Sequence, residues 1–178
     1  MTPSARLSAV VELLDTIFGT TGRAEQVVGA YFRTRRYAGS KDRRWVSEFL
    51  YSMLRRLGEI DWTIEKLALE QTNRTRAIVA TLLLDQQDVD TVIADNFMGT
   101  HALEAPSEEE ITALKSFADV DMAEMPSHIK GNFPDWLADK LQTQYGDRSL
   151  EIMAAYRDRA PLTFRVNRQV ANRDEIIK

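Results

Sequence analysis

The sequence predicts an all-α core, bundled or orthogonal, for most of its length. Apolar residues recur at three- and four-residue spacing in successive segments up to residue 117, which places them on one helical face each time. Capping residues or glycines stand at most of the segment ends. No stretch before residue 160 alternates at the period of two that marks a half-buried strand.

The most strongly amphipathic segment spans residues 40–57. Its bulky apolar side chains form one broad helical face: Trp45, Val46, Phe49, Leu50, Met53 and Leu57. Ser40 is a favourable N-cap and Gly58 a favourable residue just beyond the C-terminal end, so both ends are marked. We expect this helix in the middle of the core.

The other helices are assigned from the same two signals, apolar period and end residues. Two are expected before residue 40, over residues 3–18 and 24–36, the first closed by glycines. Four are expected after Gly58: one capped by Asp61 and running to Leu69, one following Asn73, one over residues 88–97, and one opened by the capping box Ser107–Glu110 and running to Phe117.

The character of the chain changes near residue 119, where a connection is expected to lead to residue 132. Pro134 opens a further helix that Gly146 closes, and Asp147 caps the next one, which is predicted to run to Arg159. Residues 161–167 alternate at period two and form the first credible strand, followed by a helical start over residues 172–177. Because a lone strand is not stable, we expect it to be the first strand of a truncated α/β domain.

Composition excludes several classes of protein. The chain has no cysteine, which excludes a disulfide scaffold, a thiolate metal site and a cysteine nucleophile within it, and which fits a cytoplasmic location. Charged residues interrupt the apolar N-terminus, and no run of 18 apolar residues occurs, so neither a signal peptide nor a membrane span is expected.

The net charge of −4 hides a strong asymmetry along the chain. Residues 23–56 hold nine Lys and Arg against three Asp and Glu, whereas the remainder holds 14 against 24. A local basic surface can bind nucleic acid even in a protein that is acidic overall. The sequence therefore directs attention to residues 23–56.

Eight basic residues in this region are predicted to bind RNA: Arg33, Arg35, Arg36, Lys41, Arg43, Arg44, Arg55 and Arg56. The planar fork of a guanidinium group bonds two phosphate oxygens at once. Tyr37 and Tyr51 are interleaved with the cluster and suit stacking on an unpaired base. The alternative is a solvated arginine face paired with Glu48 and other acids.

The remaining polar and aromatic candidates are interpreted as structural. Asp42, near a helix N-terminus, is expected to pair with Arg35 or Arg56 rather than to act as an acid or base. No catalytic, cofactor-binding or metal-binding residue is predicted, because His101 and His128 lack ligand-like neighbours. The three tryptophans at helical apolar spacing are assigned to the core: Trp45, Trp62 and Trp136.

One block of residues resembles a known signature. The pattern Phe133-Pro134-Asp135-Trp136-Leu137, Leu141, Tyr145-Gly146 and Pro161-Leu162-Thr163-Phe164-Arg165-Val166-Asn167 is similar to the region just upstream of the catalytic domain in the NOP/Sun (RsmB-like) family of RNA cytosine-C5 methyltransferases. The helices before it resemble that family's N-terminal domain, which is similar to the antitermination factor NusB. Residues 5–18, Lys41-Asp42-Arg43-Arg44 and Tyr51-x-x-Leu54-Arg55 stand where that domain would place them.

The resemblance implies a NusB-like RNA-binding domain over residues 1–125, then linking helices and the start of the next domain over residues 126–178. It implies rRNA as partner, and for a longer parent enzyme S-adenosylmethionine as cofactor, a cysteine nucleophile, and possible contact between this chain and the catalytic domain. The chain departs from the family in having no cysteine and no Gly-x-Gly loop. No catalytic or cofactor residue is therefore carried over, and the expected role is RNA recognition.

Two other classes of protein remain open. A stand-alone antitermination module of the NusB type would bind a short RNA together with a protein, but it leaves residues 161–167 unexplained. A protein-interaction domain would offer the arginine face to an acidic partner.

Overall fold

The computed structural model describes residues 1–157 and 159–176, and all regular secondary structure in that part is helical. No helix in those ranges is both long and apolar enough to cross a membrane. The α-helices follow one another as α1 (Pro3–Phe18), α2 (Ala24–Thr34), α3 (Ser40–Arg55), α4 (Leu57–Lys66), α5 (Asn73–Leu84), α6 (Val89–Asn96), α7 (Glu108–Lys115), α8 (Ser127–Lys130), α9 (Ala138–Tyr145), α10 (Ser149–Ala154) and α11 (Arg173–Ile176). The predicted all-α class is confirmed.

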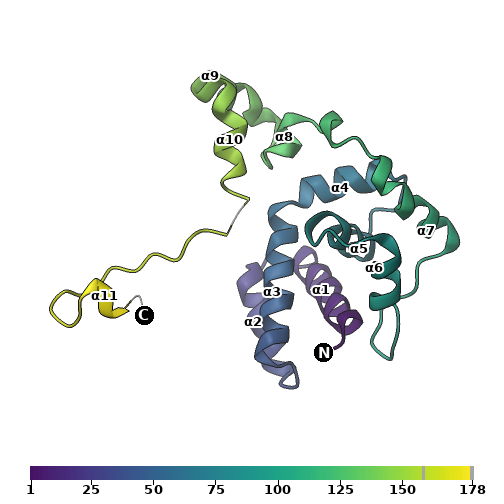
Figure 1. The fold of residues 1–178 in the computed structure, drawn as a ribbon, viewed down its shortest axis with the longest axis horizontal. Helices are drawn as coiled ribbons and strands as arrows, with labels where there is room; N and C mark the ends of the chain where they lie inside the picture. The colour runs from purple at the N-terminus through teal and green to yellow at the C-terminus, as the bar shows by residue number, and fades with distance from the viewer. Residues whose placement is uncertain (158, 177–178) are drawn as a thin grey trace.

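The core lies where α1, α3 and α5 meet (Figure 1). α1 packs against α2, α3, α5 and α6, so it is the most central helix of the body. The apolar stripe predicted for α3 is buried through Val46, Phe49, Leu50 and Met53, against α1 residues such as Leu14. Each such side chain removed from water contributes about 1.5–3 kcal/mol, which is how the period-3.6 pattern drives the fold.

The end predicted for the central helix is wrong. α3 ends at Arg55 and α4 begins at Leu57, so Gly58 lies inside α4 and does not terminate a helix. A side-chain carbon at Gly58 would lie 3.6 Å from Cγ2 of Ile129 in α8. The glycine therefore stands at the contact between α4 and α8, which no local pattern reveals.

Other boundaries differ by smaller amounts. α2 stops at Thr34, before the predicted end, and Asp61 lies inside α4, where it accepts hydrogen bonds from Arg76 of α5 at 2.7 and 3.0 Å. The predicted capping role of Asp61 is therefore wrong, and its partner lies 15 residues away in the chain. The capping box of Ser107 and Glu110 at the start of α7 is confirmed.

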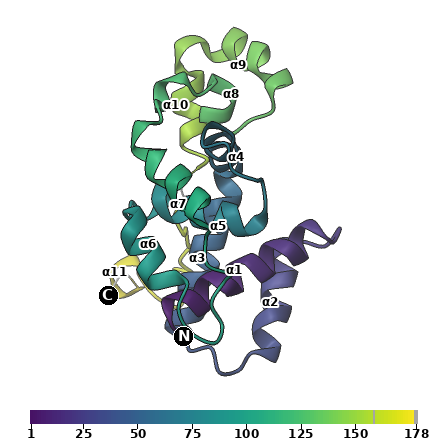
Figure 2. The ribbon, with the colours of Figure 1, turned by 90° about the vertical axis from the view of Figure 1, so that its right-hand side faces the viewer.

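Helices α8, α9 and α10 form a second layer above α4 (Figure 2). Gly146, with φ of +57°, closes α9 as predicted, and α10 then ends at Ala154. Trp136 does not join a core, because its side chain is 68% exposed with the Lys140 ammonium 5.3 Å from the ring centroid. Its placement in the core is therefore corrected, whereas Trp62 is buried.

The strand predicted over residues 161–167 is not formed. These residues carry no regular secondary structure, and Leu162 and Phe164 are exposed. An isolated strand has no partner for its backbone groups, so period-two alternation alone cannot hold it. The segment leaves the helical body and leads to α11 (Figure 1); residue 177 of the predicted helical start lies outside the described residues.

Candidate nucleic-acid interface

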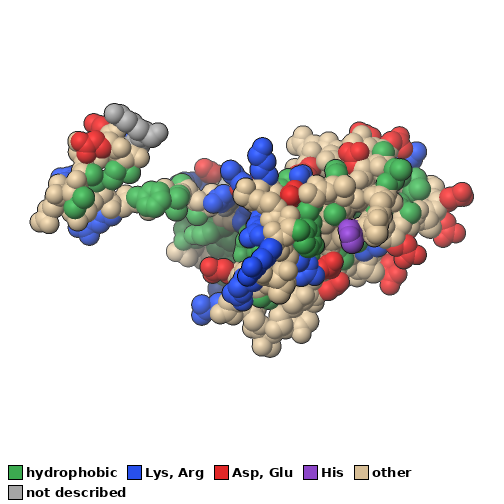
Figure 3. Space-filling view, turned by 90° about the horizontal axis from the view of Figure 1, so that it is seen from below, with side chains coloured by type: hydrophobic (Ala, Val, Ile, Leu, Met, Phe, Trp, Pro, Cys, Tyr) green, Lys and Arg blue, Asp and Glu red, His purple; other side chains and the backbone are tan. Residues whose placement is uncertain are grey.

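Lys and Arg side chains gather at the end of the molecule where α2 meets α3, whereas acidic side chains gather beside α6 and α7 (Figure 3). The short link of residues 35–39 joins the two helices, so the predicted basic residues at the end of α2 and at the start of α3 share one surface. Arg55 and Arg56 lie apart from it at the other end of α3. The eight predicted residues thus divide into a group at the α2–α3 end and a distant pair.

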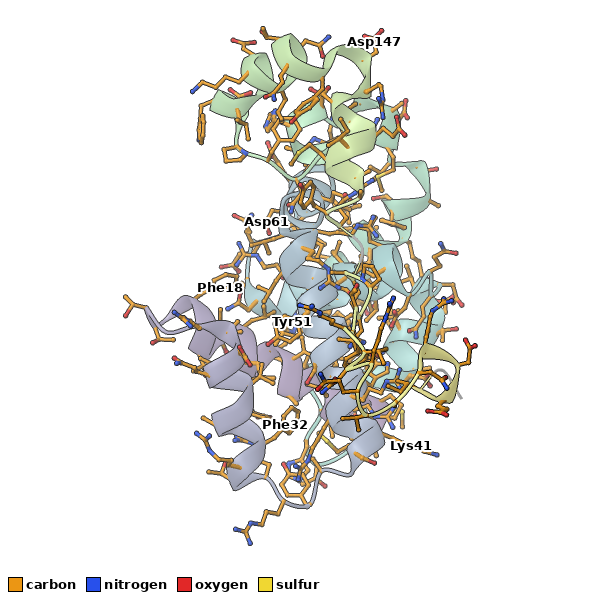
Figure 4. The ribbon with its side chains drawn as sticks, turned by 90° about the vertical axis from the view of Figure 1, so that its left-hand side faces the viewer. Phe18, Phe32, Lys41, Tyr51, Asp61 and Asp147 are labelled. Atoms are coloured by element: carbon orange, nitrogen blue, oxygen red, sulfur yellow. The ribbon has the colours of Figure 1, made fainter. Side chains whose placement is uncertain are left out.

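Three of the eight are exposed and make no hydrogen bond or ion pair within the described residues. Arg33 lies in the last turn of α2, Arg36 follows that helix, and Lys41 lies in the first turn of α3. In Figure 4, Lys41 lies at the N-terminal end of α3, far from Tyr51 in the middle of the same helix. We call Arg33, Arg36 and Lys41 the free cations.

Two further residues are surface groups with acidic partners. The Arg44 side chain is 77% exposed, and its Nε donates to Glu48 at 3.1 Å. Arg35 donates to Glu12 of α1 at 2.7 Å, and its guanidinium lies 3.7 Å from the ring centroid of Tyr31. Exposed pairs contribute about 0–1 kcal/mol, so Arg44 can exchange Glu48 for a phosphate at little cost.

The last three residues are engaged in holding the fold. Arg43 Nε donates to the carbonyl of Ala38 at 2.7 Å and so fastens the α2–α3 link to α3. Arg55 Nε donates to the carbonyl of Arg157 at 2.9 Å. Arg56 Nε donates to Glu59 at 2.9 Å. That these three arginines contact RNA remains a prediction. Such contacts would have to use guanidinium N–H groups other than the ones that already bond protein groups.

Glu59 is the most deeply buried carboxylate in this group, with a side chain only 4% exposed. It lies in α4 and is paired with Arg56 and with Arg157, which follows α10. Two guanidinium groups compensate the charge that burial would otherwise penalise. This network joins the helical body to the layer of α8–α10.

Two arginines outside the predicted cluster lie against α3 and α4. Arg157 contacts Arg55 and Glu59, and Arg159 donates to Glu48 at 3.2 Å. They are more than 95 positions from the cluster in sequence, as the separations of 98 and 111 residues to Glu59 and Glu48 show. A count of charge in a continuous window has no means of finding them.

The two candidate stacking residues differ in access. Tyr37 lies in the α2–α3 link with a side chain 74% exposed. Tyr51 is half-buried in α3, and burial together with the nearby charge of Glu25 raises the pKa of its phenol. Tyr37 is therefore the aromatic ring that faces solvent beside the free cations.

Asp42 is a structural carboxylate, but its partners were predicted wrongly. Its Oδ2 accepts from the N-terminal ammonium of Met1 at 2.9 Å, and its Oδ1 accepts from Arg6 Nε at 2.8 Å. Arg35 and Arg56 instead pair with Glu12 and Glu59. The hydrogen bond from the N-terminus, followed by that from Arg6, lowers the pKa of Asp42.

The residues of this chain do not fit S-adenosylmethionine. The sequence has no Gly-x-Gly loop, and the described residues hold no parallel sheet at whose edge such a loop would sit. No group of three or more His, Asp or Glu in the described part could hold a metal ion. The free cations give this surface exposed positive charge, and no step of a methyl transfer is assigned to it.

Comparison with known proteins supports the resemblance in the C-terminal block. A family model described as the ferredoxin-like domain of RsmF/B-like methyltransferases matches residues 133–178. Within the match, the described residues are helical in α9, α10 and α11, and residues 161–167 carry no regular secondary structure.

Curated relatives match a larger part of the chain. Ribosomal RNA small subunit methyltransferase B of Klebsiella pneumoniae is 28% identical over 149 residues, which cover 76% of this chain and 35% of the relative. The protein of the same name from Escherichia coli O1:K1 / APEC is 28% identical over 148 residues, covering 75% of this chain and 34% of the relative. The chain thus spans about a third of the length of the curated relatives it matches.

No solved structure matches the chain. The family model links residues 133–178 to known proteins, and the relatives, which cover about three quarters of the chain, link most of the helical region as well. Together these matches confirm that the chain is related to the Sun/RsmB family of rRNA methyltransferases.

Proposed function

We propose that this chain is the RNA-recognition region of an rRNA cytosine-C5 methyltransferase. The helical region through residue 125 would hold a structured rRNA segment, and residues 126–178 would connect it to a methylating domain. Relatives about three times as long, named as small-subunit rRNA methyltransferases, support this division. Because rRNA is the proposed partner, we expect the protein to act in the cytoplasm.

One observation carries the proposal: the free cations lie where α2 ends and α3 begins, in a protein of net charge −4. Arg33, Arg36 and Lys41 have no partner among the described residues, so each is available to a phosphate. Such contacts supply affinity and register but carry no sequence information. The bound rRNA would be oriented by charge and shape.

The methyl transfer itself belongs to residues outside this chain. S-adenosylmethionine would supply the methyl group, and a cysteine would be needed as nucleophile, but this sequence contains none. The chain alone is therefore expected to bind rRNA without methylating it. Its part in the reaction is to raise the local concentration of the substrate and to fix its orientation.

The test is a salt titration of binding to a folded small-subunit rRNA fragment. We expect log affinity to fall linearly with log salt, because binding releases counterions. Replacing all three free cations by alanine should weaken binding and reduce the slope by about 0.7–0.9 for each phosphate that is no longer neutralised.

A matched control removes other surface cations that already have acidic partners. Lys115 pairs with Asp90 and Arg148 with Glu151, and both lie away from the α2–α3 end. Alanine at these two positions should leave the slope unchanged. Equal slopes for wild type and the triple variant would contradict the proposal.

A further inference from the structure

A hollow of about 240 Å³ is lined in part by Tyr37, the residue that follows Arg36 in the link between α2 and α3. One helical face of α1 lines it through Ala5, Ser8 and Glu12, and it is bordered by Tyr37 from the α2–α3 link and by His101 from the loop after α6. The Ser8 hydroxyl donates to the carbonyl of His101 at 2.7 Å, which fixes that loop against α1. This hydrogen bond therefore joins two of the elements that line the hollow.

The size of the hollow limits what it can hold. Sites for drug-sized ligands measure about 300–1,000 Å³, so this one suits a smaller planar group. Tyr37, 74% exposed, offers a ring face at the rim. Exposure of a large aromatic ring beside phosphate-binding cations is the arrangement that single-stranded nucleic-acid sites use.

The hollow also carries a fixed hydrogen-bond acceptor. Glu12 Oε2 accepts from the Tyr31 hydroxyl at 3.0 Å and from Arg35 at 2.7 Å, which holds the carboxylate in place. Its Oε1 accepts no hydrogen bond from the described residues. Burial and the charge of Glu12 raise the pKa of Tyr31, so the phenol remains a donor. A base N–H can bond Oε1 without disturbing the bridge.

We propose that this hollow receives one unpaired nucleobase of the bound RNA, stacked on Tyr37, while the free cations hold the flanking phosphates. Arg36 immediately precedes Tyr37, and Lys41 follows the same link, so phosphates on either side of a flipped-out base meet a cation. The inference rests on the proposed RNA-binding function and adds a preference for loops over duplex. Phosphate contacts alone would give no such preference.

The experiment compares two RNAs with the same number of phosphates: a small-subunit rRNA hairpin with 2-aminopurine in its loop, and a fully paired duplex. For the full chain we expect tighter binding to the hairpin and quenching of the 2-aminopurine on binding. Tyr37→Ala should lower hairpin affinity about 5- to 150-fold, the range for loss of one stacked base, and abolish the quenching. Affinity for the duplex should stay within about twofold of wild type, because phosphate binding remains.

Three further variants make the result specific. Tyr37→Phe keeps the ring and should behave as wild type. Ala5→Leu fills the hollow without removing a cation and should also lower hairpin affinity and quenching, provided that circular dichroism and the melting temperature are unchanged. Tyr156→Ala, at an equally exposed tyrosine (73%) on the C-terminal side, should have no effect.

The outcomes distinguish the base site from the proposed RNA-binding function. Salt-dependent binding of both RNAs that neither Tyr37→Ala nor Ala5→Leu alters would overturn the base site and leave the proposed function standing. Absence of salt-dependent binding to either RNA would overturn both.

Discussion

Glu59 shows how one buried residue joins two parts of the molecule. Its carboxylate is surrounded by Arg56 from the α3–α4 junction and Arg157 from beyond α10. Glu59→Gln should lower the free energy of unfolding by about 1–3 kcal/mol, because charge-assisted hydrogen bonds are lost in a buried position. Urea unfolding measures it, with the exposed Glu65→Gln of the same helix as control. Equal stabilities for the two variants would contradict this account.

Asp42 gives a prediction of pH dependence at the same scale. Its folded-state pKa is lowered from the ordinary 3.8, so its contribution to stability is present above that value and is lost as the pH falls through the lower folded pKa. Wild type should therefore lose stability more steeply below about pH 4 than Asp42→Asn. Urea midpoints at stepped pH measure the difference. Asp95→Asn, at an exposed carboxylate of α6, should keep the wild-type slope.

Glycines test the account of helix boundaries at the scale of elements. Gly58 lies in α4, where a methyl group would make an ordinary contact with Ile129, 3.6 Å away. Gly58→Ala should therefore raise the free energy of unfolding by about 0.5–1 kcal/mol. Gly146 has φ of +57°, and Gly146→Ala should lower it by about 1–3 kcal/mol. Thermal unfolding measures both, and loss of stability in Gly58→Ala would contradict the room for a methyl group between Gly58 and Ile129.

Most helices could be predicted because the signal is local. The apolar stripes of α1, α3 and α5 and the capping box at Ser107 lie within a few turns of the residues they organise. The end of α3 could not be predicted, because Gly58 lies at a contact with Ile129, which is 71 positions away in the chain. The predicted strand over residues 161–167 is not formed, for the same reason. Alternation indicates which side chains a strand would bury, but it does not provide a second strand to pair with it.

The candidate site was predictable in part. Clustering of charge located the α2–α3 surface, since Arg33, Arg36 and Lys41 are close in sequence as well as in space. It could not show that Arg43 and Arg56 already bond protein groups, because their partners depend on how the link and α4 fold. The hollow beside Tyr37 was invisible for the same reason, since α1 and the loop after α6 supply its walls.

In the molecule as a whole, the basic surface lies on the most tightly packed part, and packing decreases toward the C-terminal segment. The tightly packed body of α1, α3 and α5 supports the basic end, and the α8–α10 layer is fastened to the body by Glu59. The segment after residue 159 contributes exposed apolar groups and little packing (Figure 1). The expected order of local stability is therefore body first, layer second and this segment last.

Limited trypsin digestion tests that order and the role of Arg43 together. Exposed arginines occur both in the tail, at Arg165 and Arg168, and in the α2–α3 link, at Arg36. The link is fastened by the Arg43 bond to Ala38 at 2.7 Å, whereas residues 161–166 have no regular structure, so the tail should be cut first. Mass spectrometry should find a fragment ending at residue 165 or 168. Arg43→Ala should leave tail cutting unchanged and accelerate cutting after Arg36; a first cut after Arg36 in wild type would show that the proposed RNA surface is not preformed.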